Sequence, residues 1–482
     1  MRLAALAFLA LVAPAARAQD DLAPLLRGAL VEIRVTSQSY DARSPWNKQP
    51  QRDWSGQGVM IQPGVVLTSS SVVQDQVMLE VSVANSARRY PARLKHVDGR
   101  LGLALVEITD PDLAASMKPL PLGEPVRLDD EFDIYMLGQD NVLERSTARV
   151  VRADAQQTRL TLRLKTTCSD SGRGQVALRG GRIVGLLQST VPNRQEGVLL
   201  SLETIRRYLA DFDDGTYHGC PGPGMFIQPL LREDLRTYYG VGADRHGIVV
   251  SRVIQGRTGD GVAREGDVLL AVDGYAIDDE GKFTHELHGR LAASYLFQGR
   301  RYAGDRIPLQ LLRGGQTLDV EVELKGLTEA EMLVPEGGSG TRPEFLVAGG
   351  LVILELDKQL TRMIGRSPGG VILRRYADRA EWDPPQDRRR IVFVDRVYAD
   401  PANKGFEDLS QTPLARVNGM PIREIADVAK ALETSPTAFH VFQFEGVESD
   451  FVIPAGQLGE INARIAAAYR ITRLRHLSGD PE

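Results

Sequence analysis

The sequence is poor in cysteine, tryptophan and histidine, with 2, 3 and 7 residues in a chain of 482. The two cysteines, Cys168 and Cys220, permit at most one disulfide, and the sequence leaves open whether they form a bridge or stay as free thiols. After residue 18 there is no apolar run long enough to span a bilayer. A formal net charge of only −5 gives no reason to expect nucleic acid or an anionic membrane surface as a partner.

The first 18 residues differ from the rest of the chain. Arg2 makes a short basic start, residues 3–16 are apolar, and Ala16-Arg17-Ala18 has the small-x-small pattern of a cleavage site. This arrangement is typical of a secretory signal peptide. Its removal changes the formal charge from −5 to −7, because the segment contains two arginines and no acid. We expect export to a bacterial periplasm, with full secretion as the second choice.

Length and composition predict several folded domains rich in strands. At about 100–200 residues per domain, the chain is long enough for roughly three. With 43% hydrophobic and 25% charged residues it has the composition of an ordinary globular protein, and 47 glycines and 26 prolines fit many short strands and tight turns. Between residues 22 and 215, β-branched runs alternate with turn residues, which indicates a double barrel of antiparallel strands. Apolar residues at helical spacing predict a closing helix over 202–212.

Two further strand-rich segments follow a glycine- and proline-rich hinge at 219–224. A strand at 247–253 and the strand-and-turn run at 264–274 have the pattern of a PDZ domain. After a flexible spacer at 336–340, a similar order of strands and turns predicts a second, divergent PDZ domain. A terminal helix is expected from Gln457 to about Leu474, because Leu458, Ile461, Ile465 and Tyr469 share one helical face.

Residues 56–73 indicate the family of the first domain. They form a small-Gly-hydrophobic strand, a turn and a second strand containing Leu67-Thr68 and Val72-Val73, similar to the Leu-Thr-Asn-x-His-Val-Val segment of HtrA/Deg serine proteases. With the signal peptide and tandem PDZ domains, the chain resembles this family from about residue 25 to 475, and its C-terminal half looks most like the plant Deg branch. The resemblance implies a mainly β fold, a chymotrypsin-like double β-barrel followed by two PDZ domains. The implied boundaries are 1–18 for the signal peptide, 22–215 for the degenerate trypsin-like protease domain, 220–326 and 342–455 for the PDZ domains, and 456–482 for the C-terminal helix and tail.

The resemblance also shows where this chain departs from a serine protease. Ser71 occupies the position of the catalytic histidine, and Gly102 that of the catalytic aspartate, four residues after Asp98. A serine protease needs the imidazole to accept the serine proton and the carboxylate to orient that imidazole. Because an alcohol does not ionise near neutral pH, Ser71 is no substitute for the base. Of the seven histidines only His96 lies in the barrel, where it is expected to be exposed or capped.

The nucleophile motif of the family, Gly-Asn/Asp-Ser-Gly-Gly-Pro, corresponds to residues 169–174. Ser171 matches the nucleophile and Asp170 its flank, whereas Ser169 replaces the first glycine of the oxyanion loop and Arg173 replaces another glycine. With two triad positions substituted, we expect Ser171 to be inactive. The alternative is an active serine endopeptidase in which Ser171 works with a non-standard base.

With the catalytic positions substituted, the function that the resemblance still implies is peptide binding. PDZ domains bind an extended C-terminal peptide as an added strand and hold its carboxylate with backbone N–H groups. In the first PDZ domain this site corresponds to Gly224, Met225, Phe226 and Ile227, and in the second the equivalent loop is 348–351. No cofactor is predicted. No metal site is predicted either, because the His-Glu-Leu-His run at 285–288 is one residue short of the spacing that zinc needs.

The sequence therefore predicts an exported pseudoprotease that binds peptide C-termini or unfolded polypeptides and acts as a chaperone-like or regulatory scaffold. Besides the active peptidase, a structural assembly subunit without a peptide ligand stays open. The family resemblance implies a homo-oligomer, a trimer held by aromatic contacts near the start of the barrel, with Trp46 and Trp54 as candidates.

Overall fold

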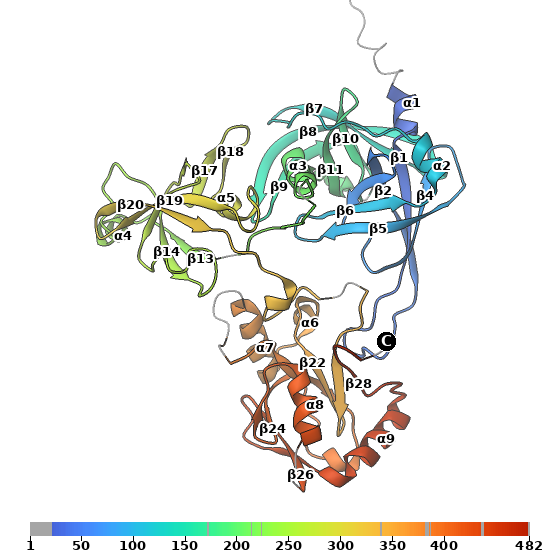
Figure 1. The fold of residues 1–482 in the computed structure, drawn as a ribbon, viewed down its shortest axis with the longest axis vertical. Coiled ribbons are helices and arrows are strands. Elements are labelled where there is room, and N and C mark those ends of the chain that lie inside the picture. Colours follow the sequence, from blue (N-terminus) through green and yellow to red (C-terminus); the bar gives the residue numbers. More distant parts are fainter. Residues whose placement is uncertain are drawn as a thin grey trace, which may run out of the picture.

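The computed structural model describes residues 22–170, 173–213, 215–222, 224–337, 340–380, 385, 387–434 and 438–480. The predicted signal peptide lies outside these residues. Figure 1 shows a body of two barrels, a first smaller unit beside it and a second below both. None of the helices in the described part of the chain has the length and apolar character to cross a membrane.

The first barrel is a closed antiparallel sheet in which strands far apart in sequence are neighbours, in the order β1-β2-β3-β6-β5-β4. Alternate residues of the first strand, Val31, Ile33 and Val35, point into the barrel and are buried. The strands are β1 (Leu30–Ser37), β2 (Arg52–Gln62), β3 (Val65–Ser69), β4 (Gln76–Val83), β5 (Tyr90–Asp98) and β6 (Leu103–Ile108). Helices α1 (Leu22–Arg27) and α2 (Pro111–Ser116) flank it.

The second barrel is closed in the equivalent order β10-β11-β12-β9-β8-β7. Its strands are β7 (Glu131–Leu137), β8 (Leu143–Gln156), β9 (Arg159–Thr166), β10 (Val176–Arg179), β11 (Arg182–Val191) and β12 (Glu196–Ser201), with 3-10 turns η1 (Gln139–Asn141) and η2 (Pro192–Arg194). Helix α3 (Leu202–Ala210) follows directly, as predicted, because the Ser201 hydroxyl caps it by accepting from the Thr204 N–H at 3.3 Å. The predicted double barrel is confirmed.

The first small unit is built on a sheet in the order β13-β14-β15-β19-β20, with β16 paired to β15. The strands and helices are β13 (Met225–Pro229), α4 (Glu233–Tyr238), β14 (Ile248–Val253), β15 (Val268–Val272), β16 (Tyr275–Ala276), β17 (Lys282–His285), β18 (Gly289–Ala292), α5 (Ser294–Gln298), β19 (Arg306–Arg313) and β20 (Gln316–Glu323). Strands β17 and β18 form a separate hairpin. Strand β13 is at the edge of the sheet.

The second small unit has a sheet in the order β27-β26-β24-β23-β22-β21-β28, with β25 paired to β24. Its strands are β21 (Phe345–Ala348), β22 (Leu351–Glu355), β23 (Val392–Val397), β24 (Thr412–Val417), β25 (Met420–Pro421), β26 (Phe439–Phe444), β27 (Phe451–Pro454) and β28 (Arg475–His476). Its helices and 3-10 turns are η3 (Glu329–Glu331) in the preceding linker, α6 (Lys358–Met363), α7 (Pro368–Arg379), η4 (Pro401–Asn403), α8 (Ile425–Thr434), η5 (Ala455–Gln457) and α9 (Leu458–Tyr469).

The C-terminal segment belongs to this second unit. Helix α9 buries Ile461 and Ile465, as their spacing predicted, and ends at Tyr469 because Arg470 takes a left-handed backbone conformation. The chain then returns as β28, which pairs with β21. The sheet thus continues past residue 455, where the sequence placed the end of the second PDZ domain, since the returning strand carries no strong strand pattern of its own.

Both small units contact the barrels through polar and aromatic side chains. His288, at the tip of the β17–β18 hairpin, is buried and its Nε2 lies 2.8 Å from Glu203 Oε1 on α3. The second unit is held by the loop between β1 and β2, where Arg43 Nε donates to Asp395 Oδ1 at 2.9 Å. Figure 1 shows this loop reaching down to the second unit.

Trp46, in the same loop, is buried within its own chain. Its ring lies 5.6 Å from the Phe345 ring and 6.2 Å from the Tyr398 ring, both in the second unit. The predicted role of Trp46 in trimer contacts is therefore not supported, because its ring is covered by this chain's own PDZ core. Trp54 is half-buried and donates its indole N–H to the Val72 carbonyl at 2.8 Å.

The cysteines do not form a disulfide. Cys168 is buried in the core of the second barrel, and Cys220 in a separate core cluster beside α3. Burial raises the pKa of both thiols. Both are therefore held as neutral, poorly reactive thiols.

Candidate functional site

The cleft between the barrels brings Ser71 and Gly102 together. Ser71 is exposed just beyond the end of β3, whose last residue Ser69 pairs with Leu103 at the start of β6. The Ser70 N–H donates to the Gly102 carbonyl at 3.1 Å. The two positions to which the resemblance assigns the family's histidine and aspartate are therefore neighbours across adjacent strand ends.

Gly102 is surrounded by polar side chains of the second barrel. Its φ of +76° is in the left-handed region, where glycine is favoured. A Cβ atom at this position would lie 2.7 Å from Arg159 Nη1 and 3.3 Å from Gln188 Oε1. Gln188 Oε1 also accepts from the Ser69 hydroxyl, which lies 3.0 Å from the Ser71 hydroxyl. A guanidinium thus lies where the resemblance places a carboxylate.

The loop with the nucleophile motif is described only at its two ends, because Ser171 and Gly172 lie outside the described residues. Ser169 and Asp170 are exposed, and one Asp170 carboxylate oxygen accepts from Gln175 Nε2 at 2.5 Å. On the other side, the Arg173 carbonyl accepts from the Gln57 N–H of β2 at 2.8 Å. The Arg173 end of the motif is therefore bonded to the first barrel, whereas Asp170 is bonded within the second.

A cavity of about 860 Å³ opens beside Ser71 and Arg159. It is bounded by both barrels, by the linker between the PDZ units and by Lys358 of the second unit. Among the described residues that line it there is no histidine. The volume is within the range of ordinary ligand pockets.

His96 is not in this cavity. Its Nδ1 lies 2.9 Å from the Tyr208 hydroxyl of α3, and its ring lies 4.3 Å from the Tyr217 ring. It is half-buried, and burial lowers its pKa, which favours the neutral imidazole. The expectation of an exposed or capped histidine is met in part, since the ring is capped by Tyr208 within an aromatic cluster.

The predicted peptide strand of the first PDZ unit is at an open sheet edge. Strand β13 pairs with β14 on one side, and no further strand pairs with it in the described part of the chain. Met225 and Phe226 are half-buried and Ile227 is 39% exposed. Gly224 precedes the strand without room for a side chain, because a Cβ there would lie 2.1 Å from the Thr258 carbonyl oxygen.

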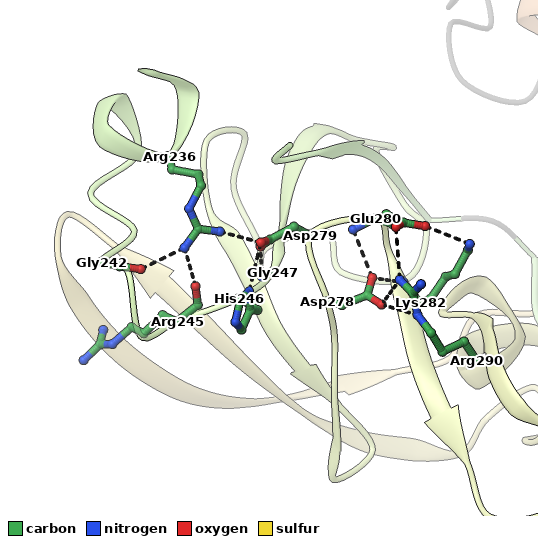
Figure 2. Close-up of polar contacts among 10 residues, drawn as sticks. All are labelled: Arg236, Gly242, Arg245, His246, Gly247, Asp278, Asp279, Glu280, Lys282 and Arg290. Atoms are coloured by element: carbon green, nitrogen blue, oxygen red, sulfur yellow. Dashed lines mark hydrogen bonds and ion pairs between the residues drawn. The ribbon is translucent and has the colours of Figure 1, made fainter. Parts of the chain in front are cut away.

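Figure 2 shows the polar contacts that hold the turn at Asp279 to residues 246–247 and to Arg236. Asp279 accepts from the Gly247 N–H at 3.0 Å, lies 2.9 Å from His246 Nδ1 and forms an ion pair with Arg236 at 2.6 Å. Burial raises and these hydrogen bonds lower the pKa of Asp279, which lies below its ordinary value overall. The next turn contacts β13, since a Cβ at Gly281 would lie 3.9 Å from Ile227 Cδ1. The turn that contains Asp279 is therefore held next to β13 by contacts within the chain.

The corresponding strand of the second PDZ unit is β22. Strands β13 and β22 pair with β14 and β23 in the same register, each with one irregularity after the second residue. The free side of β22 is covered by β21, which pairs antiparallel to it from Phe345↔Leu354 to Ala348↔Leu351. The chain itself thus occupies the place where a peptide would add to the sheet.

The histidine run of the first PDZ unit is structural. His285 ends β17 and His288 follows in the hairpin turn, so the two imidazoles are not on one helical face. No cluster of three metal-ligating side chains occurs within the described ranges. The sequence offered no signal for the pairing of His288 with Glu203, nor for Arg159 and Gln188 beside Gly102, because both arise from segments that meet only in the folded chain.

Comparison with known proteins agrees with this architecture. Residues 56–186 match the trypsin-like peptidase domain family and residues 334–477 a PDZ domain family. The chain is similar to Protease Do-like 2, chloroplastic, of Arabidopsis thaliana, with 26% identity over 430 residues that cover 86% of this chain and 70% of that protein. It is 23% identical over 415 residues to Protease Do-like 4, mitochondrial, of the same plant, which covers 84% of this chain and 77% of that protein.

Among solved structures, a variant of the HtrA-type protease AlgW with a decapeptide has the same fold over 64% of this chain and 98% of its own, at 16% identity and a TM-score of 0.51. Together these matches confirm the predicted HtrA/Deg resemblance.

Proposed function

We propose that this HtrA/Deg-type chain is an exported pseudoprotease that captures peptide tails or unfolded polypeptides through its first PDZ domain. The observation that carries the proposal is the composition of the cleft. Ser71 and Gly102 stand where the family has its general base and its carboxylate, and Arg159 Nη1 lies 2.7 Å from where a Gly102 side chain would begin.

The chemistry of these side chains supports loss of proteolysis. A guanidinium is always protonated and accepts no proton, so Arg159 does not replace the missing imidazole. Removing the histidine of a serine protease alone costs on the order of a millionfold in rate, about 8 kcal/mol of transition-state stabilisation. His96, the barrel's own histidine, is bonded to Tyr208.

The two PDZ edges support capture by the first domain. Backbone groups of β13 face outward at an open edge, which is the arrangement that β-strand addition requires. Strand β22 has its equivalent edge paired with β21. The first domain is therefore the peptide receptor, and the second serves assembly of the chain.

The sequence supports a location and an assembly state. The basic, apolar and small-residue segments of residues 1–18 support export to a periplasm. Family resemblance supports a homo-oligomer, a trimer, whose contacts involve surfaces other than the buried Trp46 ring. Light scattering of the purified mature chain measures its subunit number.

The proteolytic part is tested with casein and a serine-reactive fluorophosphonate. We expect the mature chain neither to degrade casein nor to be labelled above the level of its Ser171→Ala variant. Casein degradation that Ser171→Ala abolishes would show that the second barrel's serine has a working base and would overturn the pseudoprotease assignment.

The binding part is tested with fluorescein-labelled casein as an unfolded probe, followed by anisotropy. Substitution of Gly224 is unsuitable, because any side chain there collides with the Thr258 backbone. Ile227→Asp instead puts a charge beside the acidic turn that contains Asp278 and Asp279, and is expected to weaken casein binding at least tenfold. Val452→Asp is the matched control, since Val452 is 43% exposed on β27, an edge strand of the second domain.

A wild-type chain that does not bind casein would favour the structural-subunit reading. Equal loss in both variants would show that charge on any PDZ edge disturbs binding and that β13 is not the receptor strand.

A further inference from the structure

Arg159 is a cation that pairs with none of the described residues. It begins β9 and is half-buried, yet its guanidinium makes no hydrogen bond or ion pair with any residue in the described part of the chain. Arg163, on the same strand, shows the usual arrangement, with its Nε 3.1 Å from Asp154 Oδ2. Burial lowers the pKa of Arg159, because the charge is partly withdrawn from water without compensation.

The carboxylate that acts on Arg159 through space already has hydrogen-bond partners of its own. Asp98 acts on Arg159 through space, but one of its oxygens accepts from the Leu101 N–H at 2.8 Å and the other from the Tyr217 hydroxyl. Asp98 therefore holds the turn before β6 and leaves the hydrogen-bonding groups of Arg159 unused.

A second donor beside Gly102 is also unsatisfied. Gln188 Nε2 is buried and makes no hydrogen bond, whereas the Oε1 of the same amide accepts from Ser69. Gln188 Oε1 and Arg159 Nη1 both approach the Cβ position of Gly102, at 3.3 and 2.7 Å. A buried donor without an acceptor is energetically costly. Of these two side chains, Arg159 lines the cavity, so its guanidinium is the one that an acceptor from outside the chain can reach.

The cavity of about 860 Å³ gives access to Arg159, which lines it together with Ser71 and Thr158. The other lining cations have partners. Arg100 donates to the Cys220 and Pro221 carbonyls at 2.8 and 2.7 Å, and Lys358 Nζ lies 2.6 Å from Glu336 Oε1.

The acids that line the cavity are on segments other than β9. Asp75 follows β3 and accepts from the Gly340 N–H at 3.1 Å, and Glu336 pairs with Lys358. Glu329 belongs to the linker turn η3. Among the described cations that line the cavity, Arg159 is therefore the one whose donors are all available to a ligand.

We propose that Arg159 binds a carboxylate of the captured polypeptide, so that the former catalytic cleft is a receptor for acidic side chains or a chain's terminal carboxylate. The inference rests on the proposed function, because a working peptidase would have to keep this cleft free for its own triad. A guanidinium presents parallel N–H groups that match the two oxygens of a carboxylate, and such charge-assisted pairs are about twice as strong as neutral hydrogen bonds. The ligand would then supply a carboxylate beside Gly102, the position to which the family resemblance assigns an aspartate.

The test uses three fluorescein-labelled decapeptides of alanine and serine that differ at one group. One has an internal aspartate and an amidated end, one has asparagine instead with an amidated end, and one has asparagine with a free C-terminal carboxylate. Binding is measured by anisotropy with the full mature chain carrying Ile227→Asp, so that the first PDZ groove does not contribute. We expect at least one of the two carboxylate peptides to bind at least tenfold more tightly than the amidated asparagine peptide. Tighter binding of the aspartate peptide would identify an acidic side chain as the source of the carboxylate, and tighter binding of the free-end peptide would identify the chain terminus.

Arg159→Gln is expected to abolish this preference, and Arg163→Gln, the matched control on the same strand, to retain it. Arg159→Met keeps the apolar stem without the charge and should also abolish it, which provides a second variant if Arg159→Gln does not fold. Equal binding of all three peptides, no binding of any, or a preference that survives Arg159→Gln would overturn the inference.

Failure here is distinguishable from failure of the proposed function. Loss of the carboxylate preference leaves the casein results unchanged, whereas Ser171-dependent cleavage of casein refutes the pseudoprotease whatever the decapeptides show.

Discussion

The two PDZ domains of this chain have the same strand order and differ at one edge. Strands β13 and β22 pair with their neighbours in the same register, so Ile227 corresponds to Ile353 and Pro229 to Glu355. Beyond β13 no further strand is paired in the described part of the chain, whereas beyond β22 lie β21 and then β28. The availability of a PDZ groove therefore depends on what the rest of the chain places beside it.

The difference arises from the segments that precede each domain. Residues before β21 lead into a strand whose four side chains are all buried, with Phe345 fully inaccessible. Residues before β13 are held to the barrel instead, through Arg100 and the Cys220 and Pro221 carbonyls and through Arg207 and the Gly219 carbonyl. A segment bonded to the barrel is not available to cover the edge of β13.

The largest effect is expected from Phe345→Ala in β21. The ring is fully buried and packs against Trp46, so its loss should lower the free energy of unfolding of the second domain by about 3–5 kcal/mol. Ile227→Ala in the exposed strand β13 should cost about 1 kcal/mol. Denaturant unfolding followed by circular dichroism measures both. If both substitutions lowered the free energy of unfolding by a similar amount, β21 would contribute no more to the stability of the second domain than β13 does to that of the first.

A pH dependence should distinguish the domains next. Burial raises the pKa of Glu355 on β22 to about 7, from 4.5, whereas the equivalent Pro229 on β13 does not titrate. The folded state therefore holds this proton more tightly than the unfolded chain, so stability is fully present below pH 4.5 and is lost as the pH rises through about 7. The loss for the second domain is on the order of 3 kcal/mol.

Glu355→Gln should remove this pH dependence and stabilise the second domain at pH 8. Unfolding curves at pH 5 and pH 8 provide the measurement. The Glu355 carboxylate also accepts from the Ile425 N–H at 2.8 Å, and the glutamine oxygen retains that hydrogen bond. An unchanged difference between the two pH values in the variant would assign the effect to another group.

The smallest effect is expected from removing β28. A chain ending after Arg473 loses the hydrogen bond from the Val347 N–H to the Leu474 carbonyl at 2.7 Å and the Arg475–Glu433 ion pair at 2.7 Å. We expect a loss of about 2 kcal/mol and faster hydrogen exchange at β21. A chain ending after Ser478 is the control, because it keeps both contacts. Unchanged exchange at β21 would show that the edge is protected without β28.

Local patterns in the sequence predicted most of the architecture. Alternating apolar residues and turn signals predicted the barrels, the helical spacing of apolar residues predicted α3, and the spacing of Ile461 and Ile465 predicted α9. These features depend on neighbours within a few residues, so one sequence contains them. The substitutions that the resemblance implies at Ser71 and Gly102 stay predictions, which rest on the motifs around these two residues.

Contacts between distant segments could not be predicted. Trp46 was expected at a subunit interface and packs instead on Phe345, nearly 300 residues later in the chain. Cys168 and Cys220 lie in different cores and stay unpaired. Strand β28 has only two residues. Neither β28 nor β21 has a sequence pattern that indicates which edge it covers.

Short-range periodicity and residue identity were enough to predict the barrels and the succession of two PDZ domains. The position of Arg159 over Gly102, where no carboxylate of the described residues pairs with it, and the difference between the open and the covered PDZ edge arise only in the folded chain. Those outcomes depend on which surfaces meet, and burial of charge and pairing of strand edges have energies only once distant segments are side by side.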